Sequence, residues 1–213
     1  MTVTIERQTR LDPEAETRFA EIYEVSFPPS ERDETADLIA SIAAGERLCL
    51  LARRDGVVVG FAVLFSLYEP ALAFLEYMAV APHERNVGIG GSILKDLQTH
   101  LRADGDSLGI VLEVDPPEEA EGEERTLRER RVGFYLRHGA AVVECAPRYR
   151  APNLVHEDET VNFTLLWLPL GGEAPAELTG RLLRGCIEAI LTQSYELSRD
   201  DPLIEEVLDD LAC

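Results

Sequence analysis

A glycine-rich stretch between two apolar segments limits the fold of this chain more than any other feature. Residues 75–80 are mostly apolar and extended in pattern, Pro82 ends that segment, and 92–101 carries apolar residues at helical spacing. Gly88, Gly90 and Gly91 lie between the two segments. The sequence therefore predicts a strand, a glycine loop and a helix in direct succession.

The glycine loop has the properties of an anion site. Residues without a Cβ let main-chain N–H groups approach a ligand closely, and a helix N-terminus offers unpaired donors with partial positive charge. Phosphate is the anion that such a site favours. The loop is not a Walker loop, because no Lys-Ser/Thr follows its last glycine, and its R-x-x-G-x-G spacing differs from the dinucleotide fingerprint.

The loop resembles the acyl-CoA loop of the GNAT superfamily of N-acetyltransferases. In that family a strand leads through V-x-P and a short turn into [RQ]-x-x-G-[IVL]-[GA] and a helix. The residues that match are Val80, Pro82, Arg85, Gly88, Ile89 and Gly90. The resemblance implies acetyl-CoA as co-substrate and transfer of its acetyl group to a primary amine, without a metal. The other interpretation is a strand-to-helix turn whose glycines only ease packing.

The resemblance also implies which residues hold the cofactor. Main-chain donors of the loop would bind the CoA pyrophosphate, with the Arg85 side chain as an additional contact. The main chain at the end of the preceding strand would bind the pantetheine arm. The complete predicted set is Met78, Ala79, Val80, Arg85, Asn86, Val87, Gly88, Ile89, Gly90 and Gly91.

Tyr135 is the candidate general acid. Residues 134–140 (F-Y-L-R-H-G-A) resemble the family's F-Y-x-x-x-G-[FA] helix end, where the tyrosine protonates the departing CoA thiolate. A phenol is protonated at neutral pH and carries its hydroxyl on a rigid ring. The alternative is a tyrosine that packs on the helix with its hydroxyl at the surface.

Glu76 is the second catalytic candidate. A lone carboxylate within an apolar strand is unexpected unless a partner is present. A glutamate at this offset is similar to that of the spermidine/spermine-type acetyltransferases, where it faces the amine; it would orient the ammonium or accept its proton. The alternative is an ion pair with an arginine. Glu113 and Asp115, at the end of the strand 108–114, are further candidates to line the same cleft.

The order of predicted elements is βααβββαβαββ over residues 1–170. Residues 47–53 and 57–67 form a hairpin around Asp55-Gly56, the run 118–124 is a solvated acidic loop, and the last strands cover 141–147 and 161–168. This order predicts an α/β fold with a mixed, mostly antiparallel sheet flanked by helices, which is also the GNAT order.

Residues 171–213 form a C-terminal helical extension outside that pattern. Residues 171–175 are a linker by composition, 176–197 carries one apolar stripe, and Asp201-Pro202 starts a short second helix. Two such stripes cannot bury themselves. They dock either on their own domain or on a second subunit, and a homodimer through these helices is the preferred prediction.

The composition of the chain limits the classes of partner that it can bind. A net charge of −20 argues against nucleic acid, whose phosphates need a positive surface. An acidic surface draws in cationic amines, but adaptation for solubility or halotolerance is the explanation of this charge that we prefer. The longest apolar run, 57–68, is too short to span a bilayer, and the N-terminus lacks a signal-peptide pattern, so we expect a cytoplasmic protein.

The four cysteines are scattered, and we expect them to be reduced, without a disulfide or zinc site.

Two functions fit these observations. The first is an N-acetyltransferase in which a small-molecule or peptide amine attacks acetyl-CoA directly in a ternary complex. The second is an acyl-CoA-binding or regulatory module that keeps the fold without turnover. Both bind CoA, but only an enzyme needs Tyr135 or Glu76. The identity of the amine does not follow from the sequence.

Overall fold

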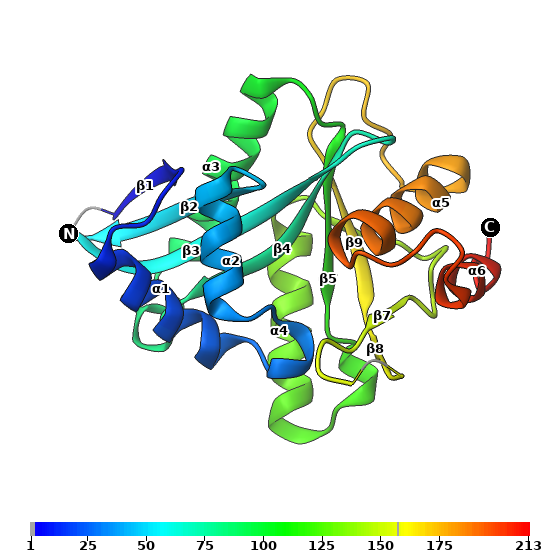
Figure 1. Ribbon diagram of the computed structural model, residues 1–213, viewed down its shortest axis with the longest axis horizontal. Helices are drawn as coiled ribbons and strands as arrows, with labels where there is room; N and C mark the ends of the chain where they lie inside the picture. Colours follow the sequence, from blue (N-terminus) through cyan, green and yellow to red (C-terminus); the bar gives the residue numbers. More distant parts are fainter. Residues whose placement is uncertain (1–2, 157) are drawn as a thin grey trace. The chain divides into compact units, whose positions relative to one another are not determined.

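The computed structural model describes residues 3–156 and 158–213 (Figure 1). The strands are β1 (Val3–Gln8), β2 (Arg47–Arg54), β3 (Val57–Leu67), β4 (Leu72–Val80), β5 (Gly109–Val114), β6 (Ala141–Val142), β7 (Arg150–Pro152), β8 (Thr160–Asn162) and β9 (Thr164–Pro169). The helices are α1 (Pro13–Ser26), α2 (Thr35–Ala44), α3 (Ile89–Asp104), α4 (Gly122–Arg137), α5 (Gly180–Ala189) and α6 (Pro202–Asp209).

The predicted fold class is confirmed. Within the described residues the main sheet has the strand order β1-β2-β3-β4-β5-β9-β6, and β7 and β8 pair separately. Antiparallel pairing joins β1 to β2, β2 to β3, β5 to β9 and β6 to β9. The chain forms two compact units. Unit 1 comprises residues 3–66, 75–104 and 154–156, and unit 2 comprises residues 67–74, 105–153 and 158–213.

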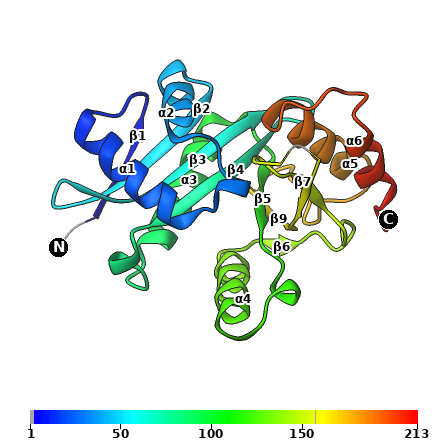
Figure 2. The ribbon, with the colours of Figure 1, turned by 60° about the horizontal axis from the view of Figure 1, so that its bottom comes forward.

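Unit 1 is organised around an aromatic core beneath α1 and α2. The Asp12 carboxylate accepts a hydrogen bond from the Ala15 N–H at 2.9 Å and so caps α1, and Gly45 ends α2 with a φ of 79°. The predicted Asp55-Gly56 turn joins β2 to β3. In this unit α1 and α2 lie on one face of the strands and α3 on the other (Figures 1 and 2). The largest aromatic members of the core are Phe19, Tyr23, Phe61 and Tyr77.

Unit 2 has helices on both faces of β5 and β9. Side chains alternate along a strand, and the β5–β9 register therefore puts Glu113 on the same face as Trp167. The Trp167 indole donates to the Pro175 carbonyl at 2.9 Å, so the C-terminal extension covers this face. On the other face, Leu168 lies 3.6 Å from the Cβ position of Gly139, just after α4. The extension and α4 thus cover opposite faces (Figure 2).

The apolar stripe of the extension is buried within the chain itself. The side chains that form its centre are each fully buried: Leu183, Cys186, Ile187, Ile190 and Leu191. This burial matches the alternative in which the extension docks on its own chain. It also covers the apolar surface on which the dimer prediction depended. Pairing of two chains stays a prediction. The second helix begins as predicted, with the Asp201 carboxylate accepting from the Leu203 N–H at 2.9 Å.

Several predicted boundaries near the end of the sheet were wrong. The strand expected over 141–147 has two residues, and the one expected over 161–168 is divided at Phe163, whose N–H donates to the Tyr149 carbonyl at 3.0 Å. The acidic run is not wholly a loop, because α4 begins at Gly122. Glu123 and Glu124 then lie in its first turn, where their negative charge interacts favourably with the positive end of the helix dipole.

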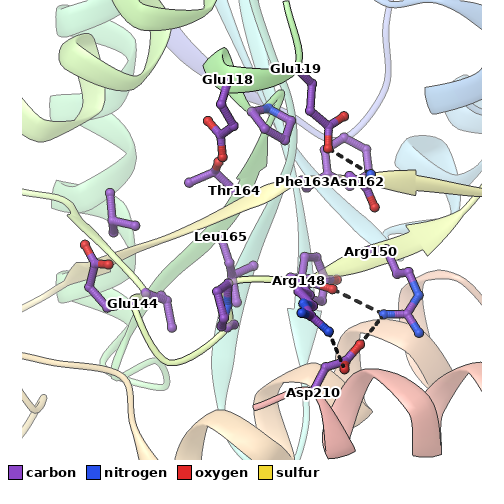
Figure 3. Close-up of a pocket in the computed structure, with 16 residues that line it drawn as sticks. Glu118, Glu119, Glu144, Arg148, Arg150, Asn162, Phe163, Thr164, Leu165 and Asp210 are labelled. Atoms are coloured by element: carbon purple, nitrogen blue, oxygen red, sulfur yellow. Dashed lines mark hydrogen bonds and ion pairs between the residues drawn. The ribbon is translucent and has the colours of Figure 1, made fainter. Parts of the chain in front are cut away.

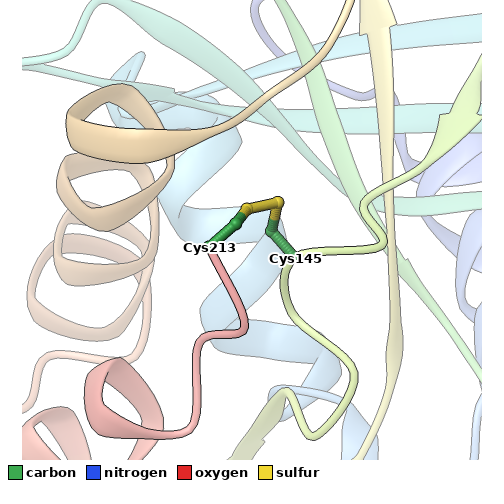
Figure 4. Close-up of a disulfide and its surroundings, with 2 residues drawn as sticks. All are labelled: Cys145 and Cys213. Carbon is green, nitrogen blue, oxygen red and sulfur yellow. A yellow bond between two sulfur atoms is a disulfide. The ribbon is translucent and has the colours of Figure 1, made fainter.

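The expectation of four reduced cysteines was also wrong. Cys145 and Cys213 form a disulfide with a Cα–Cα distance of 5.4 Å (Figure 4). The two residues are 68 positions apart, so no short spacing pattern marked them as a pair. Cys49 and Cys186 are free and buried.

Candidate functional site

The glycine loop of unit 1 has the strand–loop–helix geometry that the sequence predicts. After β4, a single 3₁₀ turn covers Pro82–Glu84, and Asn86 and Gly88 then adopt positive φ angles of 65° and 89°. Ile89 is buried and anchors the start of α3. Arg85 to Gly88 are exposed, so the main chain of the loop is open to a ligand.

The start of α3 presents main-chain donors for which the described residues supply no acceptor. The Ser92 N–H makes the first helical bond, to the Gly88 carbonyl at 3.1 Å. Within the described residues, the N–H groups of Ile89, Gly90 and Gly91 donate to no protein group. The first turn also lacks acidic residues. Three consecutive donors at the positive end of a 16-residue helix have the properties of an anion site, and binding of an anion there stays a prediction.

Arginine side chains fix the base of this loop. The Arg85 guanidinium donates to the Val80 carbonyl at 2.9 Å and to the Ser26 hydroxyl at 3.4 Å. Arg54 forms an ion pair with Glu84. In this arrangement the Arg85 side chain ties the loop to the end of β4, and the additional phosphate contact that the resemblance implies for it stays a prediction.

The predicted pantetheine segment forms the end of β4. Ala79 is buried, and Met78 and Val80 on either side of it are partly exposed. The Ala79 carbonyl lies 2.8 Å from the position that a Cβ at Gly60 would occupy, so only glycine permits this close approach of β3. The end of β4 is therefore held at its main chain, and its side chains are lightly constrained.

Glu76 forms an ion pair with Arg47, the alternative that the sequence left open. The Arg47 Nε lies 2.7 Å from Oε2 of Glu76, and a second guanidinium nitrogen lies 3.2 Å from Oε1. Asp33 joins the cluster at 3.4 Å from Arg47. The side chains of Arg47 and Glu76 are only 13% and 6% exposed. Desolvation acts to lower the pKa of Arg47, but the charges of Glu76 and Asp33 outweigh it and raise that pKa.

Tyr135 lies in the last turn of α4 in unit 2. The residue is 7% exposed, and its ring packs edge-on against that of Phe134, with centroids 5.1 Å apart. Burial raises the pKa of Tyr135 to about 12, although the charge of Arg131 acts in the opposite direction. No group among the described residues forms a hydrogen bond with its hydroxyl. The phenol thus stays protonated, and that proton is not committed to the described protein groups.

Unit 2 also holds a cluster that the sequence analysis named only in part. The Glu113 carboxylate accepts one hydrogen bond from the Tyr149 hydroxyl at 2.5 Å and another from the Tyr195 hydroxyl at 2.7 Å. The strand pattern pointed to Glu113, but nothing in the sequence linked it to residues 36 and 82 positions away. Asp115, the other strand-end candidate, forms an ion pair with Arg131.

A cavity of about 520 Å³ lies in unit 2 beside β8 and β9 (Figure 3). Glu119 on one side accepts a hydrogen bond from the Asn162 amide at 2.8 Å. On the other side, Asp210 pairs with Arg150 at 2.7 Å and with Arg148 at 3.7 Å. Both arginines of the lining are thus already paired with Asp210.

The described part of the chain contains no His, Cys, Asp or Glu group arranged to hold a metal ion. Among the same residues, no helix is long and apolar enough to cross a membrane.

Comparisons with known proteins agree with this geometry. Residues 16–139, more than half of the chain, match the family model described as the acetyltransferase (GNAT) family. No curated protein matches significantly. A Bacteroides thetaiotaomicron protein assigned to the GNAT family is 24% identical, with a TM-score of 0.68 over 91% of this chain and 99% of that one.

Two further solved structures have the same fold. The Escherichia coli ribosomal-protein-S18-alanine N-acetyltransferase is 20% identical, with a TM-score of 0.57 over 82% of this chain and 99% of that one. A Salmonella typhimurium protein solved with its cofactor acetyl-CoA is 17% identical, with a TM-score of 0.59 over 82% of this chain and 98% of that one.

Proposed function

Because the chain belongs to the GNAT acetyltransferase family, we propose that it transfers an acetyl group from acetyl-CoA to a primary amine by direct attack in a ternary complex. The observation that carries this proposal is the set of N–H groups at Ile89, Gly90 and Gly91 that have no partner in the described part of the chain. They would hold the CoA pyrophosphate, and the main chain of Met78, Ala79 and Val80 would hold the pantetheine arm. The co-crystallised acetyl-CoA of the Salmonella protein supports the choice of cofactor.

The proposed chemistry needs an amine nucleophile and a proton for the leaving group. The neutral amine nitrogen attacks the thioester carbonyl carbon, the C–S bond breaks, and the thiolate takes a proton. We assign that proton to the Tyr135 hydroxyl, because its phenol stays protonated at neutral pH and has no partner among the described residues. The ammonium releases one proton to water before attack and the nitrogen releases a second as the amide forms, while water returns a proton to the Tyr135 phenolate.

Glu76 enters the proposal as an orienting group. Its charge is shared with Arg47 and Asp33, so it would steady the ammonium through this cluster more readily than it would remove a proton. The same ion pair is the observation that favours the second candidate, an acyl-CoA-binding module without turnover, since a structural role already explains this buried carboxylate.

An acceptor screen tests the function directly. Thiol release from acetyl-CoA is followed across polyamines, amino acids, aminoglycosides and peptide N-termini, with water as the background. Amine-dependent release that Tyr135→Phe abolishes supports the enzyme. Tight CoA binding without release for any amine class supports the binding module instead.

A further inference from the structure

The C-terminal tail, defined here as residues 202–213, reaches the cavity in unit 2. Asp210, at the end of α6, lines the cavity together with most of the segment 142–150. Figure 3 shows its carboxylate beside the guanidinium groups of Arg148 and Arg150. The position of the tail therefore decides whether these two positive charges of the lining are neutralised.

The tail has a small apolar face. Within the tail, all of which the structure describes, the buried side chains of α6 are Ile204 and Val207. By contrast, α5 buries four side chains and the π-helical turn Ile190–Ser194 after it buries two more. A helix of eight residues is not stable by itself in water. The tail thus stays folded only while something holds it in place, and its own apolar face contributes less than that of α5.

Ion pairs add little to this attachment. Arg150 pairs with Glu206 at 3.0 Å and with Asp210 at 2.7 Å, and Arg148 lies 3.7 Å from Asp210. The side chains of Glu206 and Arg148 are 62% and 77% exposed. Exposed ion pairs contribute little to stability and are screened by salt. These charges orient the tail but do not secure it.

The disulfide provides the covalent attachment. Cys145 lies between two lining residues, Glu144 and Ala146, and is joined to Cys213 at the end of the tail (Figure 4). The Ala212 N–H also donates to the Cys145 carbonyl at 2.9 Å. Cys213 is exposed and Cys145 is partly exposed, so a reductant can reach the bond. Exposed disulfides are the ones that are labile and regulatory.

The other two cysteines of the chain are unsuited to this chemistry. Cys49 and Cys186 are both fully buried. Burial raises the pKa of the Cys49 thiol to about 12, and burial first, with the charge of Glu113 second, raises the pKa of the Cys186 thiol as well. Only a thiolate attacks a disulfide. Thiol–disulfide exchange is therefore confined to the exposed pair.

We propose that the Cys145–Cys213 disulfide is a redox switch that holds the tail on the cavity when oxidised and releases it when a dithiol reduces the bond. Release removes Asp210 from Arg148 and Arg150, and the two free guanidinium groups then suit an anionic group. The switch does not depend on acetyl transfer, because it concerns the attachment of the tail alone.

The exchange reaction is balanced by the reductant. One thiolate of the dithiol attacks Sγ of Cys213, the more exposed residue, and the departing Cys145 thiolate takes a proton. The second thiolate of the dithiol attacks its own sulfur in the mixed disulfide and releases the Cys213 thiolate, which is protonated in turn. The protein gains two electrons and two protons, and the dithiol becomes a cyclic disulfide.

The test compares the oxidised full chain with the chain treated with dithiothreitol in the absence of denaturant. Alkylation and mass spectrometry show which cysteines are reduced and accessible. Hydrogen exchange is followed at residues 202–212 and, as the internal reference, at 180–191. Modification by phenylglyoxal reports on Arg150, whose side chain is 19% exposed. The variants are Cys213→Ser, which cannot form the bond, and Asp210→Asn, which weakens the ion pairs and keeps the bond.

We expect dithiothreitol to reduce the Cys145–Cys213 bond and to leave Cys49 and Cys186 protected from alkylation. Exchange at 202–212 should then rise by about tenfold or more, with little change at 180–191, because a covalent constraint on the tail is lost. Modification of Arg150 should become severalfold faster. Cys213→Ser should behave like the reduced wild type and should not respond to dithiothreitol.

Asp210→Asn separates the bond from the ion pairs. In the oxidised variant, exchange at 202–212 should stay within about threefold of the wild type, since exposed ion pairs contribute little. Reduction of this variant should raise exchange by at least as much as in the wild type. A tail that is already released in the oxidised variant would mean that the ion pairs, and not the disulfide, hold it, and would overturn the inference.

Two further outcomes would also overturn the inference. The first is a bond that dithiothreitol leaves intact in the folded chain, or full reduction without a change in exchange at 202–212. The second is an equal rise at 202–212 and 180–191, which would make the disulfide a general stabiliser of the extension. If Cys213→Ser does not fold, the reduced and alkylated wild type supplies the same comparison. Acetyl transfer enters none of these measurements, so failure of the proposed function leaves the switch standing.

Discussion

The two units offer chemistry of different kinds. Unit 1 presents main chain: an exposed glycine loop and three N–H groups at the start of α3. Unit 2 presents side-chain hydroxyls on Tyr135, Tyr149 and Tyr195 around a mostly apolar strand pair. Main-chain donors bind an anion whatever the side chains are, whereas a hydroxyl acts only where its own residue is kept. Changes in unit 1 should therefore affect cofactor affinity, and changes in unit 2 should affect turnover.

The two carboxylates show the same contrast. Glu76 in unit 1 is neutralised by a buried guanidinium, and Glu113 in unit 2 is held by two uncharged phenols. Breaking a buried ion pair mainly lowers the stability of the fold, because the remaining charge is left unpaired. The Glu113 carboxylate accepts hydrogen bonds from two donors that bring no charge of their own. The difference indicates that an acidic residue in a strand has to be interpreted by its donors.

The largest effect should come from Tyr135→Phe, which keeps the ring and removes only the proton. We expect kcat to fall by roughly 10²- to 10⁴-fold with CoA affinity nearly unchanged. The pKa of about 12 also predicts that ionisation of Tyr135 does not cut the rate until the pH approaches that value. Steady-state kinetics and CoA calorimetry check both points. Turnover within a factor of two of wild type would make Tyr135 a packing residue.

Breaking the Arg47–Glu76 pair should affect stability first. Glu76→Gln leaves a guanidinium that is 13% exposed without its main counter-charge, which should cost about 3 kcal/mol of unfolding free energy. Urea denaturation measures this cost. If the variant kept its stability and lost turnover, the structural role of Glu76 would be wrong and Glu76 would act on the substrate.

A smaller effect is expected from Gly88→Val. Gly88 has a φ of 89° and open space around its Cβ position, so a β-branched residue strains the loop and obstructs close approach to the pyrophosphate. CoA affinity should fall by about tenfold, or 1.4 kcal/mol, with kcat at saturation little changed.

The control for this change is Gly105→Val at the opposite end of α3, where φ is 75° and the space is equally open. The backbone strain is similar there, but no anion site is present. Calorimetry that finds the same loss of CoA affinity in both variants would mean that strain alone, and not the loop, explains the effect.

The smallest effect should come from salt. The net charge of −20 implies repulsion over the surface, and raising KCl from about 0.1 to 1 M shortens the Debye length from about 10 to 3 Å. We expect the thermal midpoint to rise by a few degrees. Wild type and Glu76→Gln should rise together, because the buried pair is poorly screened. A midpoint that falls with salt would mean that exposed ion pairs outweigh the repulsion.

The structural features that could be predicted from the sequence are those that depend on a local residue pattern. Periodicity located the strands and helices, the Asp55-Gly56 turn and the Asp201 cap, and the glycine spacing located the start of α3 within three residues of the predicted position. These features depend on neighbours in the chain. For the same reason the family match and the fold class followed from one loop and one helix end.

The rest depends on contacts between distant residues, which periodicity does not encode. Arg47 reaches Glu76 across 29 positions, and Tyr195 reaches Glu113 across 82. Phe163 interrupts a pattern that would otherwise continue as one strand, because its N–H donates a hydrogen bond to the Tyr149 carbonyl. The disulfide between Cys145 and Cys213 likewise joins residues 68 positions apart.

That disulfide makes residues 145–213 a closed covalent ring (Figure 4). The ring contains β7, β8, β9 and both helices of the extension. A single proteolytic cut within it opens the ring without releasing a fragment, so the severed strands and helices stay attached to the chain and can reassemble as though the cut were a new pair of termini. Under reducing conditions the same cut yields two separate pieces, which only non-covalent contacts, such as those of the buried side chains of α5 and the π-helical turn, hold together.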